Sequence, residues 1–326
     1  MATTEPALSA HWTFGGMVPA RSALPDVLPA DRLTTAGRLR PGPRAEVRRN
    51  HDVRSALNVA SVIVQSFGVI GAAVLVDHPL AWVAAFVLMG RSFALYLILA
   101  HEAAHRLLFS NRRINDLVGR WVLAHPGLLP FDVYRRSHMG HHREAFGPTE
   151  PDLNYYANYP IPAASFRRKL ARDVSGISGW RNLVPLLRAL GSASGRRRAV
   201  PIVVTQVAIF ALLTAIGGWW VYPLLWLLPW MTVWRLLNRL RSVAEHGGLH
   251  RSGDERETTH HVRQSLVPRF WIVPFNTGWH LAHHVDPSLP FQELPGVHAE
   301  LVDSGWVTEA YTWPDYRSLW RAAVRP

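Results

Sequence analysis

The chain has 326 residues, of which 48% are hydrophobic and only 18% are charged, and it contains no cysteine. Disulfides, thiolate zinc sites and iron–sulfur clusters are therefore excluded within this chain, so any bound metal must rest on histidine, helped by carboxylates, amides or water. The formal net charge of +12 would suit nucleic acid, but no DNA- or RNA-recognition motif is visible, and we expect no nucleic-acid partner.

Residues 1–54 are rich in Pro, Ala and Arg and show no regular hydrophobic period. Such a composition predicts a flexible or surface-bound cytosolic segment. The segment does not open with a basic run followed by an apolar core, so we expect no cleaved signal peptide. Apolar character rises sharply after it, and we therefore divide the chain into this N-terminal segment and a membrane domain over 55–326.

Four apolar stretches in the membrane domain are candidates for crossing a bilayer, which takes about 20 residues. They form two pairs, and a short turn joins the members of each pair. The predicted spans are 55–76, 80–100, 200–217 and 221–238. Arg91 is the one charge in the second span and is expected to face protein or to snorkel. Pro223 and Pro229 are expected to kink the fourth span.

The basic residues indicate how these spans are oriented. Arg and Lys number 8 before the first span, 16 within 101–199 and 10 from Arg235 onward, and the turns within the two pairs have none. The positive-inside rule then places both termini and the segments 101–199 and 239–326 in the cytoplasm. The sequence thus predicts an all-α, multi-pass protein of a bacterial-type cell membrane, with four transmembrane helices in two hairpins and a cytosolic helical cap.

Three tight histidine clusters lie in the predicted cytosolic segments, and a lone histidine lies between the last two. The clusters read H-E-A-A-H, H-M-G-H-H and H-L-A-H-H, and their spacings put the imidazoles of each cluster on one face of a helix. The nine candidate ligands are His101, His105, His138, His141, His142, His246, His280, His283 and His284. So many nitrogen donors predict a metal site, and one that holds two metals.

Two other interpretations of these histidines stay open as distant alternatives. H-E-A-A-H fits the H-E-x-x-H motif of zinc metalloproteases, in which the Glu is the general base. A membrane protease would need only one more ligand and would leave both H-x-x-H-H triplets unexplained. A histidine-rich metal transporter would want polar ligands inside the spans, whereas these clusters lie outside them.

The remaining histidines and the nearby carboxylates have weaker claims. His246 is the least certain of the nine, because a cap or surface histidine before two glycines would look the same. Weaker still are His125, His250, His260, His261 and His298, and we assign His260 and His261 to surface or ligand-supporting roles. The carboxylates that could orient imidazoles through their second nitrogen are Glu102, Glu144, Asp152, Glu245 and Asp286.

With its three clusters, the A-E-H sequence, the E-P-D-L sequence at 150–153 and its topology, the chain resembles the membrane fatty acid desaturase and hydroxylase superfamily over about residues 55–300. The resemblance implies a non-haem di-iron centre on the cytoplasmic side, with the nine histidines as its ligands. In some members an asparagine one turn before the lone histidine holds a water on the metal. Ser242 occupies that position here, which departs from the pattern.

The resemblance also implies an oxygen-dependent lipid desaturase that introduces a C=C double bond into a fatty acyl chain. A hydroxylase or a carotenoid-type ketolase of the same superfamily is the alternative, because the histidine clusters do not distinguish these reactions. The substrate would enter from the lipid bilayer, and arginines could pair with its headgroup. Electrons would come from a separate ferredoxin, flavoprotein reductase or cytochrome, since the chain has no haem or flavin motif.

Overall fold

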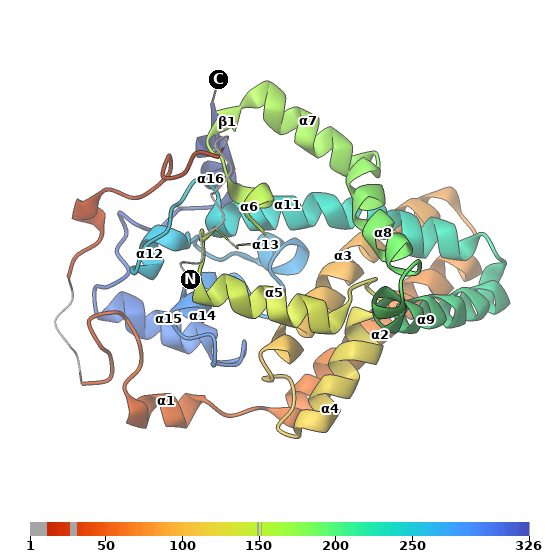
Figure 1. Ribbon diagram of the computed structural model, residues 1–326, viewed down its shortest axis with the longest axis horizontal. Helices are drawn as coiled ribbons and strands as arrows, with labels where there is room; N and C mark the ends of the chain where they lie inside the picture. The colour runs from red at the N-terminus through yellow and green to blue at the C-terminus, as the bar shows by residue number, and fades with distance from the viewer. Residues whose placement is uncertain (1–11, 27–30, 149, 151, 326) are drawn as a thin grey trace. The chain divides into compact units, whose positions relative to one another are not determined.

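The computed structural model describes residues 12–26, 31–148, 150 and 152–325 (Figure 1). Within these residues the chain is almost entirely helical, which confirms the all-α prediction, and its only strands are two short ones that pair in parallel. The elements are η1 (Arg21–Ala23), α1 (Pro41–Val47), α2 (Asp52–Val76), α3 (Pro79–Ala104), α4 (Arg112–Leu117), η2 (Val118–Ala124), α5 (Phe131–Arg143), α6 (Leu153–Tyr156), β1 (Ile161–Pro162), α7 (Ala163–Val174), α8 (Ile177–Ala189), α9 (Ala193–Gly217), η3 (Pro223–Leu227), α10 (Leu228–Met231), α11 (Val233–His246), α12 (Glu255–Thr258), α13 (Leu266–Trp271), α14 (His280–Val285), α15 (Leu294–Asp303), α16 (Tyr316–Ala322) and β2 (Val324–Arg325).

The chain divides into two compact units, which we call the span unit and the polar unit. The span unit comprises Asn50–Arg135 and Arg167–Asn238, and the polar unit comprises Met1–Arg49, Arg136–Phe166 and Arg239–Pro326. The predicted division of the chain at residue 54 is not tested by this partition and stays a prediction.

Three helices of the span unit are long and apolar enough to cross a membrane, by length and composition: α2, α3 and α9. They have 25, 26 and 25 residues, and at 1.5 Å per residue each is longer than the ~30 Å hydrocarbon core of a bilayer. Helix α3 packs against α2, and Figure 1 shows these helices in orange. Arg91 on α3 faces protein as predicted, because it is 9% exposed and donates from Nη1 to Oε1 of Gln65 on α2, 2.7 Å away.

The fourth predicted span, 221–238, is not among the helices that meet this criterion in the described part of the chain. The segment is divided into η3, α10 and α11, and Thr232 separates the last two with φ −118° and ψ −82°. Pro223 begins η3 and Pro229 is the second residue of α10, positions at which a helix tolerates a proline. The interruption follows them at Thr232, whose backbone dihedral angles lie outside the helical range. Three candidate spans are thus supported, and the pattern of two complete hairpins is not confirmed.

The end of α3 is held by side chains that follow it in the chain. Asn115 donates from Nδ2 to the carbonyl of Ala103 at 2.9 Å, and its Oδ1 accepts from two backbone amides. Arg135 donates to the carbonyls of Ala103 and Ala104 at 2.9 and 3.1 Å. These bonds satisfy carbonyls that a helix end leaves without partners. A Cβ on Gly119 would lie 2.6 Å from the Ala103 side chain, so only glycine permits this close approach.

The polar unit has its own core, to which the N-terminal segment contributes. Phe146, Leu153, Tyr156 and Leu249 form a buried cluster against which the described residue Phe14 packs. Further along, Leu24, Leu33 and Leu39 are buried. Arg44 pairs with Asp286 at 2.5 Å. In its described part, the segment that we predicted to be flexible or surface-bound therefore makes buried contacts; residues 1–11 and 27–30 lie outside the described residues.

Candidate metal centre

Four histidines of the polar unit converge through their Nε2 atoms, and we call them the four-histidine cluster. His141 lies on α5, His246 ends α11, and His280 and His284 lie on α14. The Nε2 atoms form a row: His141 to His284 is 3.3 Å, His284 to His280 is 3.1 Å and His280 to His246 is 3.1 Å. All four side chains are buried, with exposed fractions of 3–6%.

Hydrogen bonds among imidazoles cannot account for this row. An Nε2 atom carries either one proton or one lone pair, yet the Nε2 atoms of His280 and His284 each face two other Nε2 atoms. Two imidazole nitrogens that bind one ion at ~2.1 Å, with angles of about 90–110° between them, would lie ~3.0–3.4 Å apart. The observed spacings fall in that range, so the donor set fits a metal ion. Imidazole suits iron, zinc, copper and nickel alike.

The opposite ring nitrogens, Nδ1, face oxygen atoms. Nδ1 of His246 lies 2.8 Å from the carbonyl oxygen of Thr258, which can only accept, so Nδ1 carries the proton and Nε2 keeps its lone pair. Nδ1 of His141 lies 2.8 Å from Oε2 of Glu150. Such outer contacts fix the tautomer of a metal-binding histidine and orient its ring.

Carboxylates also lie near the Nδ1 atoms of the two α14 histidines. Oε1 of Glu245 is 3.5 Å from Nδ1 of His280, and Oε2 of Glu255 is 3.9 Å from Nδ1 of His284. Glu245 is itself held by Arg241 at 2.6 Å. Every member of the four-histidine cluster therefore presents its Nδ1 edge to an oxygen atom and its Nε2 edge to the other rings.

Electrostatics keep most of the cluster in the neutral form that binds metals. Burial lowers the pKa of His246, His280 and His284 well below the usual histidine value. Burial also acts to lower the pKa of His141, but the hydrogen bond and charge of Glu150 outweigh it and raise that pKa overall. A bound cation would take the place of a proton on each of these Nε2 atoms.

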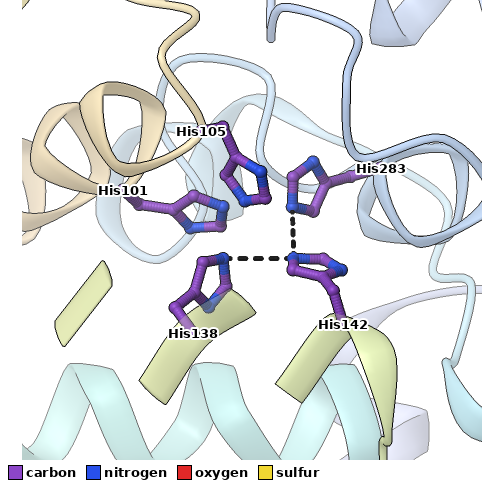
Figure 2. Close-up of side chains that lie close together, drawn as sticks. All are labelled: His101, His105, His138, His142 and His283. Carbon is purple, nitrogen blue, oxygen red and sulfur yellow. Dashed lines mark hydrogen bonds between the residues drawn. The ribbon is translucent and has the colours of Figure 1, made fainter. Parts of the chain in front are cut away.

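A second group in the polar unit comprises His138, His142 and His283, and we call it the three-histidine cluster. Nε2 of His142 lies 3.1 Å from Nε2 of His138 and 3.0 Å from Nε2 of His283, as the dashed lines in Figure 2 mark. One Nε2 atom again faces two others, so the same argument favours a shared cation. His138 and His142 come from α5 and His283 from α14.

His101 and His105 belong to the span unit. His101 lies in the last turn of α3 and is 3% exposed, and His105 is the residue that caps this helix. Their ring centroids are 4.8 Å apart, and Figure 2 shows both side chains extending from the end of α3. The predicted second span continues directly into H-E-A-A-H, because α3 runs to Ala104 without a break.

The structure changes the roles that we assigned to several carboxylates. Of the five candidates, Glu245 lies beside His280 as expected. Asp286 instead pairs with Arg44, and Glu144 pairs with Arg251 at 3.2 Å. Our candidates did not include Glu150 or Glu255. Glu150 lies in the E-P-D-L sequence close to the H-M-G-H-H cluster, and this position could have identified it as a partner of one of those histidines.

The segment around His260 holds the end of α11 in place. Thr258 accepts from His246, the His260 amide donates to the Glu245 carbonyl at 2.8 Å, and Nε2 of His260 lies 2.8 Å from the Gly247 carbonyl. Nδ1 of His260 accepts from Nε1 of Trp313 at 3.2 Å. His260 is buried, so it is not a surface residue; it supports a candidate ligand, which is the other role that we expected for it.

Residues 77–313 match the fatty acid desaturase family. The chain is similar to a dihydrorhizobitoxine desaturase of Bradyrhizobium elkanii, with 24% identity over 275 residues that cover 78% of each chain. It is similar to a beta-carotene ketolase of a Paracoccus species, with 27% identity over 228 residues, which are 68% of this chain and 81% of the ketolase.

A chloroplastic omega-6 fatty acid desaturase of Arabidopsis thaliana is 22% identical to this chain over 267 residues. The match covers 72% of this chain and 56% of the plant protein, so this chain spans about half the length of that relative.

Proposed function

The chain belongs to the fatty acid desaturase family, and from this premise we propose that it is an oxygen-dependent di-iron lipid desaturase, which introduces a C=C double bond into a fatty acyl chain. The observation that carries the proposal is the convergence of Nε2 atoms in two clusters. In the four-histidine cluster the Nε2 atoms of His280 and His284 each face two others, and in the three-histidine cluster that of His142 does. The names of two of the three relatives described above, which are desaturases, support the reaction class.

We assign the nine histidines to two iron sites. The four-histidine cluster would hold one iron. The three-histidine cluster would hold the other, together with His101 and His105 from the end of α3. When bound, the iron pair supplies the redox capacity to use dioxygen and external electrons against an unactivated C–H bond.

The protein's own groups keep this site in a defined state. Nδ1–H of His246 donates to the Thr258 carbonyl, and Glu150 holds the Nδ1 edge of His141, so the Nε2 lone pairs point to the centre. Six of the seven candidate ligands in the polar unit, all but His142, are less than 9% exposed, and this burial excludes bulk water. A dry and rigid donor set of this kind strengthens electrostatic interactions within it.

The membrane spans determine where the substrate comes from in this proposal. Three candidate spans and the distribution of arginine favour an integral membrane enzyme with both termini and the metal centre in the cytoplasm. An acyl chain would reach the site from the bilayer. Electrons would come from an external ferredoxin, flavoprotein reductase or cytochrome.

A hydroxylase or ketolase is the second candidate, and the similarity to a beta-carotene ketolase over 81% of that protein favours it specifically. Desaturation and hydroxylation both begin with removal of hydrogen from a C–H bond, and small shifts of the substrate decide between them. The histidine clusters serve either reaction.

Lipid analysis of cells with and without the chain separates these candidates. We expect new double bonds in acyl chains when the wild-type protein is made, and none with His283→Ala, which removes a member of the three-histidine cluster. His250→Ala is the matched control, because that side chain is 42% exposed and lies 3.4 Å from Glu257. New hydroxyl or keto groups without new double bonds would replace desaturase by hydroxylase or ketolase, and activity retained in His283→Ala would refute the ligand assignment.

A further inference from the structure

A cavity of about 320 Å³ lies in the span unit, between the start of α9 and the segment from η2 to the start of α5. Arg197 and Arg198, in the second turn of α9, line one side of it. Arg120 and His125 line the other. None of these residues belongs to the nine candidate metal ligands, and the proposed reaction does not use them.

The cavity carries an excess of positive charge. It is lined by three arginines and one carboxylate, Asp132, whose Oδ1 lies 2.7 Å from Nη2 of Arg120. Among the described residues no carboxylate pairs with Arg197 or Arg198, and Nε of Arg198 donates only to the Ser194 carbonyl of its own helix, at 3.2 Å. Two cations therefore remain to attract an anion.

A buried histidine in the wall of the cavity lacks a hydrogen-bond partner. His125 is 3% exposed, and its Nδ1 has no partner among the described residues. The residue is fixed in place, because its carbonyl accepts from Nε2 of Gln206 on α9 at 2.8 Å. Burial, with a contribution from the charge of Arg120, lowers the pKa of His125 to about 4, so the ring is neutral at physiological pH and can donate one hydrogen bond. Buried polar groups without a partner are rare in folded proteins.

The position of the cavity along α9 suits the headgroup region of a bilayer. After the arginines, α9 exposes apolar side chains at Val200, Val204 and Val207, with exposed fractions of 43–59%, as a lipid-facing helix does. Trp121, 41% exposed, lines the cavity too. Tryptophan and arginine are typical of the level where lipid phosphates lie, and basic pockets beside membrane helices bind anionic headgroups.

The geometry points to a phosphate-binding site formed by Arg197, Arg198, Arg120 and His125. The arginines would pair with the phosphate oxygens, and the neutral ring of His125, which lines the cavity, would offer one N–H donor beside them. The phosphate has two sources, the headgroup of an anionic phospholipid or free inorganic phosphate.

Binding is measured on the purified full-length chain in detergent, by thermal shift and native mass spectrometry. One arm adds phosphatidylglycerol and the other adds inorganic phosphate alone, with phosphatidylcholine as the zwitterionic reference. The variant R197Q/R198Q removes the two unpaired cations. The variant R112Q/R113Q removes two exposed arginines of α4, outside the cavity, and is the matched control.

Whichever of the two compounds binds the wild type, we expect R197Q/R198Q to bind it about tenfold more weakly or worse. R112Q/R113Q should bind it as the wild type does. Saturation by phosphatidylglycerol but not by phosphate identifies a lipid headgroup, and saturation by phosphate alone identifies the free anion; both support the site. Equal binding by the two double variants, or no response of the wild type in either arm, would overturn it. The measurement needs no iron and no turnover, so it is independent of the proposed reaction.

Discussion

In the span unit, His101 and His105 lie one turn apart at the end of a single helix, and Asn115 and Arg135 hold the last carbonyls of that helix. In the polar unit, seven histidines come from three helices, α5, α11 and α14, and converge through their Nε2 atoms. Helical spacing is enough to place the pair. The seven depend on hydrogen bonds from segments outside these helices, among them those made by Glu150, Thr258 and His260.

The largest expected effect comes from removing a ring at the centre of the Nε2 row. His284→Ala should lower bound iron from two to about one per chain and reduce turnover to background, because Nε2 of His284 faces two other candidate ligands. Metal analysis of the purified variant, beside a turnover assay, measures both. Two irons retained in His284→Ala would show that the four-histidine cluster is not an iron site, and His250→Ala should keep both irons.

Removing the carboxylate behind His141 should have the next largest effect. Glu150→Ala deletes the acceptor 2.8 Å from Nδ1 of His141, and loss of such an outer contact typically weakens metal binding by ~10–100-fold. Competition with a chelator of known affinity gives the ratio.

Glu150→Gln is the conservative companion, because its amide oxygen can still accept from Nδ1–H. It should recover part of the affinity that Glu150→Ala loses. Glu144→Ala, in the same loop but paired with Arg251, should bind iron as the wild type does. An effect of Glu144→Ala as large as that of Glu150→Ala would contradict the role of Glu150.

Variants of His260 test whether a residue that is not itself a candidate ligand affects iron binding. His260→Ala removes the contact to the Gly247 carbonyl beside His246 and should weaken iron binding by several-fold, less than Glu150→Ala does. A glutamine can restore a donor to that carbonyl, so His260→Gln should bind iron more tightly than His260→Ala. Equal affinities in the two variants, with equal melting temperatures, would assign His260 to packing alone.

A matched change in the span unit should act on stability and spare the four-histidine cluster. Asn115→Ala leaves the Ala103 carbonyl and two amides without this partner, which costs ~1–3 kcal/mol and lowers Tm by a few degrees. Asn182→Ala, which removes an exposed bond to the Ser178 carbonyl of its own helix, should leave Tm nearly unchanged. A larger loss of Tm in Asn182→Ala than in Asn115→Ala would contradict the capping role.

The smallest expected effect concerns a histidine pair that lies outside both clusters. The rings of His261 and His298 are 4.0 Å apart and buried. Burial lowers the pKa of His298 to about 4 and lowers that of His261 well below its usual value, with further contributions from His298 and Arg263. The unfolded chain takes up these protons near pH 6.5, so the stability that depends on the neutral pair is complete above that pH and is lost as pH falls toward 4.

Thermal unfolding of the wild type and His298→Gln at pH 7 and pH 5 measures this contribution. We expect Tm of the wild type to fall more between the two values than Tm of the variant, which has one fewer buried histidine to protonate. A fall of Tm of equal size in both proteins would show that the His261–His298 pair does not contribute to the pH dependence of stability.

Sequence patterns predicted what depends on local spacing. The three candidate spans begin within seven residues of the predicted limits and end within four, and the H-E-A-A-H cluster continues the second span. Hydropathy gave the fourth span as one helix with a kink at Pro223 and Pro229. The break at Thr232 was beyond such patterns, because nothing in the local spacing marks that residue. The contacts of Glu255 and His260 were also beyond them, because they join residues that lie far apart in the chain.

The iron content of the purified full-length protein, loaded with ferrous iron and freed of loosely bound metal, tests the central claim most directly. If the clusters are two iron sites, quantitative metal analysis will give two irons per chain. An iron content near zero after loading, or a single tightly bound zinc in its place, would contradict the di-iron account.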